Sequence, residues 1–283
     1  MRLPSPIVDA AWLADHLHEV VVADVRWYLD GRSGRAAYER GHLPGAIFVD
    51  IDTDLSGTPG GTRGGHPLPG PEQFAVAMST LGISNTTPVV AYDDTGGMTA
   101  GRLVWMLRVI GSSAALLDGG LNAWDGPLDS GHVACKATTF TQRPWPLDAT
   151  VDADEVGRHV KRSDGVVLDA RSLARYRGDD ATVDQRAGHI PGSLCAHWAA
   201  NLDAAGRFLS RDELRARYTA LGIGPHTAVV ASCGSGVSAC ADLLALERAG
   251  LGGPFGGRLF VASWSGWSAD ASRPVATGSV PRP

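Results

Sequence analysis

Apolar and polar residues alternate along the chain in two different periods. Two stretches, 99–110 and 237–249, repeat apolar residues at helical spacing, and Gly250 follows the second where a helix-ending glycine is expected. Short apolar runs typical of buried strands lie between such stretches, at 20–25, 89–92, 166–168 and 228–232. Short buried strands separated by helices predict an α/β fold with a small, mostly parallel sheet and helices on both faces.

The chain also repeats itself over a long interval. Asp24 recurs as Asp169, the turn GHLPG from Gly41 recurs as GHIPG from Gly188, and Asp93 stands where the second copy has Cys233, with intervals between 140 and 147 residues. An interval of this length suits a compact domain rather than a solenoid unit. We therefore expect two tandem copies of one α/β domain.

A polar, proline-bearing stretch separates the copies. Periodicity lapses over 129–150, DSGHVACKATTFTQRPWPLDAT, as expected of a linker. The expected organisation is a first domain at 1–128, the linker at 129–150 and a second domain at 151–283.

Composition narrows the class of protein. The 283 residues are 44% hydrophobic and 19% charged, which is typical of a soluble globular protein, and the net charge of −5 gives no reason to expect nucleic acid or an anionic membrane as partner. We find no secretory signal and no apolar run long enough to span a bilayer. The four cysteines include no CxxC pair, so neither a disulfide framework nor a structural zinc site is expected, and a reducing cytoplasm is the expected location.

The stretch ASCGSGVSAC at 231–240 carries the strongest chemical signal. Cys233 follows a predicted strand and precedes a predicted helix, and Gly234 and Gly236 leave the intervening backbone free to turn its amides inward. Such a nest and the helix dipole stabilise negative charge. A cysteine held there is expected to form its thiolate and act as a nucleophile.

The first copy lacks this nucleophile. Asp93 occupies the equivalent position, 140 residues earlier, and a carboxylate cannot carry a sulfur atom as a persulfide. We expect the first domain to be a catalytically inactive copy that is kept for structure and for one wall of the cleft.

The repeated pattern D-x-R, GH-[IL]-PG and VV-x-x-C resembles the rhodanese superfamily, and specifically its two-domain sulfurtransferases, from Val8 to Trp267. The loop CGSGVSA is similar to that of the 3-mercaptopyruvate sulfurtransferases, whereas thiosulfate-preferring members carry basic residues where Gly234 and Ser235 stand. The resemblance implies tandem rhodanese-like domains and a double displacement. Cys233 would take a sulfane sulfur from the donor and pass it to cyanide, a thiol or a thioredoxin-like protein, without metal or organic cofactor.

The resemblance also implies a proton relay. Ser235 matches the loop serine of these enzymes, and the segments FVDIDTDL and GGHPLPG resemble those that carry the aspartate and the histidine, here Asp52 and His66. Asp50 and Asp54 compete with Asp52 for this match. A Ser–His–Asp chain suits the reaction because the pyruvate leaving group needs a proton as its C–S bond breaks.

Arginine is the expected partner of a donor carboxylate, which its planar fork binds through two hydrogen bonds. The segment ARYRG resembles the family's Arg-aromatic segment and points to Arg175. The family's second arginine lies in a proline-containing stretch; here DDATVDQRAGHIPG is shorter and lacks those prolines, and Arg186 is the candidate. The remaining residues expected to line the donor site are those of the loop, Gly234, Gly236, Val237 and Ser238.

Several other residues are expected to be structural. FVASW at 260–264 departs from the family's Asp-Gly-Ser-Trp without a functional interpretation. We expect Arg171 to pair with Asp169 and the histidines of the two GH-x-PG turns to serve those turns. The side chains expected in the core or without reactivity are Trp264, Trp267, Cys135, Cys195 and Cys240.

Three other functions compete with this interpretation. A cysteine phosphatase or arsenate reductase needs an arginine at the far end of the loop, where Ala239 stands. A non-catalytic binding module would be favoured had both copies lost the cysteine. A thiosulfate:cyanide sulfurtransferase would use the same thiolate, and it differs only in the preferred donor.

Overall fold

The structure is a computed structural model, and it describes residues 3–278 of the chain. It divides into two compact units that differ from the sequence halves at two places. Unit 1 comprises residues 1–57, 68–146 and 202–208, and unit 2 comprises residues 58–67, 147–201 and 209–283. The expected linker 129–150 is shared between the units at Pro146 and Leu147, and the segment 58–67, from the first sequence half, belongs to unit 2.

Unit 1 contains a five-stranded parallel sheet in the order β1-β5-β4-β2-β3. Its strands are β1 (Ile7–Val8), β2 (Val21–Asp24), β3 (Ile47–Phe48), β4 (Val89–Tyr92) and β5 (Ala114–Leu117). Its helices are α1 (Ala10–His16), α2 (Gly34–Arg40), α3 (Pro71–Thr80), α4 (Ala100–Val109) and the short 3₁₀ turn η2 (Gly120–Ala123).

Unit 2 repeats this topology, with a parallel sheet in the order β6-β10-β9-β7-β8. Its strands are β6 (Thr150–Val151), β7 (Gly165–Asp169), β8 (Leu194–Cys195), β9 (Ala228–Ser232) and β10 (Arg258–Phe260). Its helices are α5 (Ala153–His159), α6 (Leu173–Arg177), α7 (Arg211–Ala220), α8 (Ala239–Ala249) and α9 (Ser263–Ala269), with 3₁₀ turns η1 (Gly61–Arg63), η3 (Trp198–Asn201) and η4 (Pro254–Gly256). The expected duplicated α/β fold is therefore confirmed.

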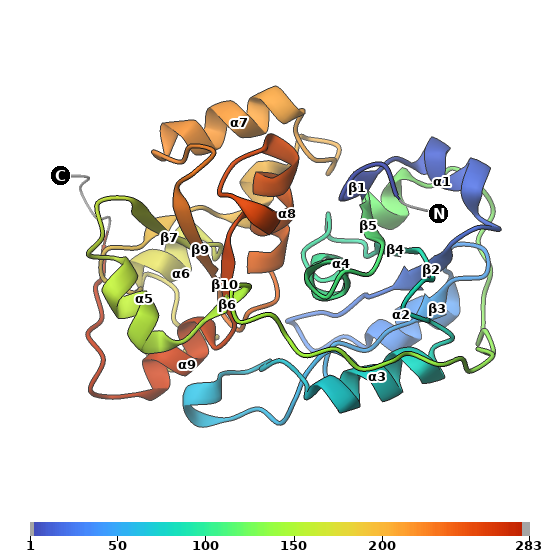
Figure 1. The fold of residues 1–283 in the computed structure, drawn as a ribbon, viewed down its shortest axis with the longest axis horizontal. Helices are drawn as coiled ribbons and strands as arrows, with labels where there is room; N and C mark the ends of the chain where they lie inside the picture. The colour runs from blue at the N-terminus through green and yellow to red at the C-terminus, as the bar shows by residue number, and fades with distance from the viewer. Residues whose placement is uncertain (1–2, 279–283) are drawn as a thin grey trace. The chain divides into compact units, whose positions relative to one another are not determined.

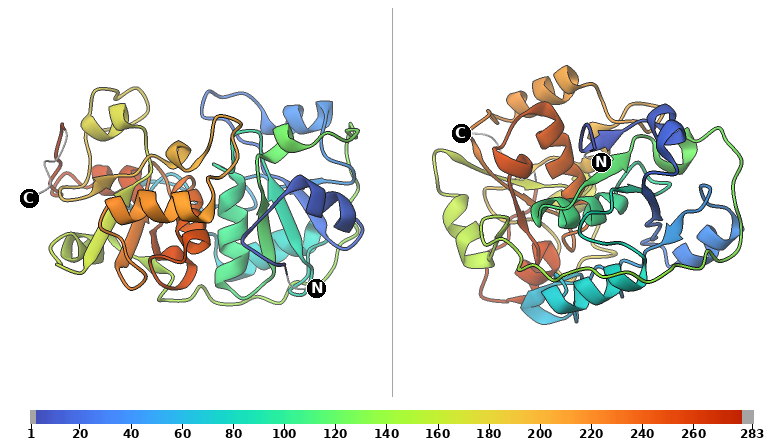
Figure 2. Two further views of the ribbon diagram at one scale, coloured as in Figure 1. Left: turned by 90° about the horizontal axis from the view of Figure 1, so that it is seen from above. Right: turned by 45° about the vertical axis from the view of Figure 1, so that its right-hand side comes forward.

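Helices cover both faces of the unit 2 sheet, as Figures 1 and 2 show. Helix α8 packs against β9, β10 and α7 on one face, with most of its residues buried. On the other face Val156 of α5 joins Trp264 and Trp267 of α9 in one hydrophobic cluster. The expectation that both tryptophans belong to the core is confirmed, since their exposed fractions are 0% and 2%. No helix in residues 3–278 is long and apolar enough to cross a membrane.

The repeated sequence motifs produce repeated local structure. Asp9 and Asp152 each begin a helix, accepting a hydrogen bond from the amide of Trp12 in α1 and of Glu155 in α5. An aspartate at this position satisfies an amide that has no partner within the helix. The sequence VDA, which occurs at 8–10 and again at 151–153, is thus a helix start in both units.

The D-x-R motifs form buried ion pairs. Arg26 binds Asp24 at the end of β2, with Nη2 donating to Oδ2 at 2.6 Å, and Arg171 binds Asp169 at the end of β7 at 2.7 Å. Each arginine also donates to the carbonyl of the glycine that begins the GH-x-PG turn, which fixes the turn to the strand end. The structural role expected for Arg171 is confirmed.

The turn histidines are structural as well. His42 and His189 are fully buried, and each Nδ1 is hydrogen-bonded to the carbonyl of a preceding tyrosine, at 2.9 and 2.7 Å. Each ring also stacks on that tyrosine, Tyr38 or Tyr176, with centroids 4.1 and 3.7 Å apart. Burial lowers the pKa of His189, so its ring stays neutral near neutral pH.

Candidate active site

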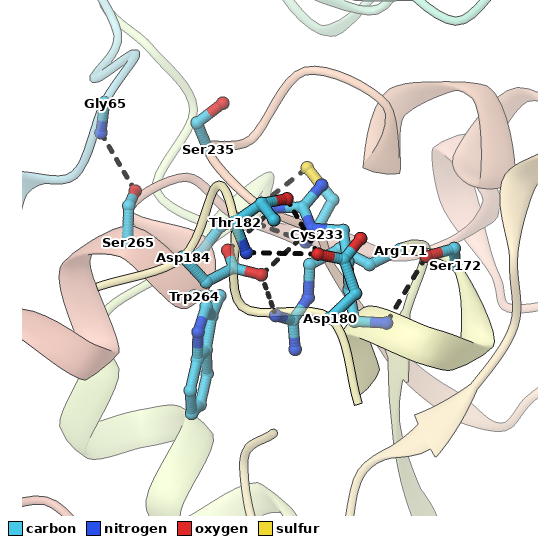
Figure 3. A network of polar contacts seen from close by, with 12 residues as sticks. Gly65, Arg171, Ser172, Asp180, Thr182, Asp184, Cys233, Ser235, Trp264 and Ser265 are labelled. Carbon is cyan, nitrogen blue, oxygen red and sulfur yellow. Dashed lines mark hydrogen bonds and ion pairs between the residues drawn. The ribbon is translucent and has the colours of Figure 1, made fainter. Parts of the chain in front are cut away.

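The loop between β9 and α8 brings a backbone amide to the sulfur of Cys233. Cys233 directly follows β9, its side chain is almost fully buried, and its Sγ accepts a hydrogen bond from the amide of Gly236 at 3.1 Å (Figure 3). The loop leads into an eleven-residue helix, so the positive end of its dipole faces the sulfur. Amides and dipole act together to stabilise a negative charge on the sulfur.

The two glycines of the loop are there for different reasons. Gly236 has φ of +82°, and a Cβ on it would stand 2.4 Å from the carbonyl oxygen of Val261. Any side chain would therefore be strained and would clash with the backbone. A Cβ on Gly234 would stand 2.9 Å from Nη2 of Arg175, so this glycine lets the guanidinium approach the cysteine loop.

The equivalent loop of unit 1 is filled by its own carboxylate. Asp93 is fully buried and accepts hydrogen bonds from four amides, at 2.8–2.9 Å, those of Thr95, Gly97, Thr99 and Ala100. The amides of this loop therefore bind an anion, and that anion is the loop's own Asp93 carboxylate. In unit 2 the equivalent loop is bonded differently: the amide that donates to Cys233 Sγ is that of Gly236, while the amide of Cys240 donates to the carbonyl of Val237 at 3.1 Å.

Ser235 and His66 are hydrogen-bonded, with Ser235 Oγ and His66 Nδ1 2.7 Å apart. Although His66 belongs to the first sequence half, the segment 58–67 that carries it is part of unit 2. The amide of Gly65 donates to Ser265 Oγ at 3.0 Å, and this bond ties the segment to α9 (Figure 3). The structure thus brings together Cys233, Ser235 and His66 within one unit.

Ser263 also contacts Cys233, and the sequence analysis did not predict this. Its hydroxyl accepts a hydrogen bond from the amide of Cys233 at 3.0 Å, donates to the carbonyl of Phe260 at 2.8 Å and lies 3.9 Å from Cys233 Sγ. Its φ of +50° is strained for a serine. The signal was available: β9 and β10 are parallel neighbours, so the residues that follow them meet at one sheet edge.

Arg175 lies beside the loop in an ion pair with Asp184, which the sequence analysis did not single out. Its Nε and Nη2 donate to the two oxygens of Asp184 at 2.9 and 2.7 Å, and Asp184 also accepts from Arg171 Nη1 at 3.1 Å (Figure 3). The side chain of Asp184 is 6% exposed and that of Arg175 17%. The sequence spacing does not predict the Arg175–Asp184 contact, because this contact depends on the path of the loop after α6.

Arg186, the candidate second ligand of the donor carboxylate, is bonded to backbone carbonyls of unit 2. Its guanidinium donates to the backbone carbonyls of Asp270 and Arg273, at 3.2–3.4 Å, while its own carbonyl accepts from Trp264 Nε1 at 2.9 Å. The side chain therefore holds the segment that follows α9. The assignment of Arg186 to the donor carboxylate stays a prediction.

Asp52, the expected third member of the relay, belongs to unit 1. Its carboxylate accepts a hydrogen bond from Trp27 Nε1 at 3.0 Å, and its amide donates to Asp50 Oδ1 at 2.8 Å. The competitor Asp54 instead accepts from the amide of Asp50 at 2.9 Å, and burial raises its pKa. The assignment of Asp52 stays a prediction.

The remaining loop residues differ in their surroundings. Val237 is buried, and Ser238 is the residue before α8 but makes no side-chain capping bond. Cys240 Sγ donates to the carbonyl of Gly236 at 3.5 Å, inside the helix start. Burial raises the pKa of the Cys135 and Cys195 thiols, which fits the expectation that neither is reactive.

Comparison with known proteins identifies relatives along the whole chain. The profile of the rhodanese-like domain matches residues 9–126 and 152–270. The chain is 36% identical to the 3-mercaptopyruvate sulfurtransferase of Escherichia coli, over 95% of this chain and 96% of that protein, and 30% identical to thiosulfate/3-mercaptopyruvate sulfurtransferase 2 of Arabidopsis thaliana, over 97% and 87%. It resembles the structure of 3-mercaptopyruvate sulfurtransferase from Leishmania major with a TM-score of 0.83 and 30% identity, covering 96% of this chain and 77% of that one.

Proposed function

This chain belongs to the rhodanese-like family, and we propose that it transfers a sulfane sulfur from 3-mercaptopyruvate to a thiophilic acceptor through a persulfide on Cys233. The observation that carries the proposal is the hydrogen bond from the Gly236 amide to Cys233 Sγ, together with the Ser235–His66 pair of the same unit. Unit 1 supplies an internal comparison, because the same loop there binds a carboxylate with four amides. The Gly236 amide suits a thiolate and a persulfide anion equally well.

In the first displacement the Cys233 thiolate attacks the donor sulfur. A sulfur–sulfur bond forms and the carbon–sulfur bond breaks, so its electron pair passes to the methylene carbon of the donor. That carbon must gain a proton as pyruvate leaves, and the donor thiol must lose one, so the persulfide keeps the negative charge. The loop amides stabilise this charge at each stage.

Ser235 and His66 are positioned to move that proton. A hydroxyl hydrogen-bonded to an imidazole at 2.7 Å can donate to the leaving carbon and be reprotonated from the ring. We assign Asp52 as the group that orients the imidazole, following the family's relay. Arg175 is assigned to the donor carboxylate, while Gly234, Gly236, Val237 and Ser238 form the walls of the donor site.

In the second displacement an acceptor nucleophile attacks the outer sulfur of the persulfide. The sulfur–sulfur bond breaks and its electron pair returns to Cys233 as thiolate. Cyanide, a low-molecular-weight thiol or a thioredoxin-like protein can each serve, since each offers a nucleophile for sulfur. We assign the chain to a reducing cytoplasm, where a thiolate nucleophile persists.

Turnover with two donors tests the proposal. Pyruvate and thiocyanate should form in equal amounts from 3-mercaptopyruvate and cyanide, and the Cys233→Ser variant should form neither. Thiosulfate is measured in parallel as the alternative donor, because it would use the same thiolate. Faster turnover with thiosulfate would show that thiosulfate is the preferred donor and would leave the role of Cys233 unchanged. Turnover in the Cys233→Ser variant would overturn the mechanism.

A further inference from the structure

Asp184 occupies one edge of the arginine that faces the cysteine loop. Arg175 turns its Nε–Nη2 edge to this carboxylate, with bonds of 2.9 and 2.7 Å. The other edge, formed by Nη1 and the second hydrogen of Nη2, keeps its donors for another partner. Because Nη2 would stand 2.9 Å from a Cβ on Gly234, the guanidinium lies against the loop of the nucleophile.

Four ion-paired side chains at Arg175 carry no net charge among themselves. Two arginines, Arg171 and Arg175, share two carboxylates, Asp169 and Asp184, and the side chains of all four are at most 17% exposed. A sulfur donor that binds at this cluster therefore finds directional hydrogen bonds but no net positive charge. A negative charge on the donor interacts with the Asp184 carboxylate as well as with the guanidinium that this carboxylate neutralises.

We propose that Asp184 sets the charge selectivity of the site, disfavouring donors with two negative charges relative to donors with one. The inference rests on the proposed sulfurtransferase function and concerns the choice between its donors. Thiosulfate carries two negative charges at neutral pH, whereas the carboxylate gives 3-mercaptopyruvate one. Coulomb repulsion from Asp184 scales with the donor charge, so the dianion is repelled twice as strongly.

Removal of the charge at Asp184 tests this selectivity. In Asp184→Asn, kcat/KM for 3-mercaptopyruvate should rise about threefold and that for thiosulfate about tenfold, since the factor per charge enters twice for the dianion. Asp184→Ser removes the same charge with a smaller side chain and should shift the donor ratio in the same direction. Asp179→Asn, an exposed carboxylate of the same loop, is the matched control and should leave the ratio unchanged.

A second readout does not depend on sulfur transfer. Iodoacetate and iodoacetamide have similar shapes and differ by one negative charge, so the ratio of their rates of alkylation at Cys233, followed by peptide mass, reports the field at the thiolate. We expect this ratio to rise about threefold in both Asp184 variants and to stay constant in the control.

The two readouts separate the possible failures. If the wild-type chain accepts sulfur from neither donor, the proposed function fails, and the alkylation ratio still decides the role of Asp184. If both donors change by the same factor in Asp184→Asn and the alkylation ratio is constant, Asp184 only holds Arg175 in place and the charge-selectivity proposal is overturned.

Discussion

At the scale of single residues, a few side chains around one sulfur define the chemistry. Cys233, Ser235 and His66 lie within one unit, although His66 comes from the other half of the sequence. The sequence predicted these three because a loop motif and a glycine-rich histidine segment are local patterns that resemble known ones. It could not predict the ion pair of Asp184 with Arg175 or the backbone contacts of Arg186, since both depend on the path of the loop after α6.

The two donors differ in their need for the proposed proton relay of Ser235 and His66. The carbon of departing pyruvate needs a proton, whereas sulfite leaving from thiosulfate needs none. Ser235→Ala should therefore lower kcat with 3-mercaptopyruvate about a hundredfold and change kcat with thiosulfate by less than about threefold. Steady-state rates with each donor measure the effect.

The matched control for this prediction is Ser265→Ala. Ser265 is also a hydroxyl that binds the segment of His66, through the amide of Gly65, but it lies outside the relay. It should affect both donors alike. An equal loss with both donors in Ser235→Ala would assign the serine to loop structure alone.

At the scale of elements, the strand and helix pattern was readable because burial dominates it. The expected runs at 89–92 and 228–232 coincide with β4 and β9, and Gly250 ends α8 with a φ of +69°. The short strands β3 and β8 were not predicted, because two-residue elements have no periodicity. The sequence also did not predict that the segment 58–67 belongs to unit 2, because this depends on long-range packing.

Helix α8 also carries a buried carboxyl that makes stability depend on pH. Burial, only partly opposed by hydrogen bonds from Asn201 and Tyr218, raises the pKa of Asp242 from 3.8 to about 7. Between these values the folded chain keeps a proton that the unfolded chain loses, so the free energy of unfolding falls as pH rises. Its slope should approach about 1.4 kcal/mol per pH unit from this group alone.

Asp242→Asn should remove this contribution. Urea unfolding at pH 5 and pH 7 is compared for the wild-type chain, the variant and Asp212→Asn, an exposed aspartate of α7. We expect a smaller loss of stability between the two pH values in Asp242→Asn only. The same loss in all three proteins would show that Asp242 is ionised throughout.

At the scale of the whole molecule, a duplicated domain has divided its tasks. Both units keep the same sheet order, the same helix starts and the same buried Asp–Arg pair. Unit 2 has Cys233 in the loop after the central strand, while the equivalent loop of unit 1 has Asp93, whose carboxylate binds the loop amides. The loop of the first unit is therefore filled by a buried carboxylate, and we expect the stability of this unit to depend on it.

Asp93→Asn tests this division. The amide group would turn an NH₂ toward backbone N–H donors, and one buried hydrogen bond or more would be lost, at a cost of about 2–4 kcal/mol in the free energy of unfolding. Sulfur uptake at Cys233 by the folded variant should be unchanged. Loss of uptake without loss of folding would show that the Asp93 loop itself takes part in the chemistry.

The most direct test of the central claim is the intact mass of the chain after brief exposure to 3-mercaptopyruvate. The wild-type protein should gain the mass of one sulfur atom, located at Cys233 by peptide mapping, and lose it again on addition of cyanide. The Cys233→Ser variant should gain nothing. If the wild-type chain gains no sulfur, or if the serine variant gains one, the account of Cys233 as the sulfur-carrying nucleophile is wrong.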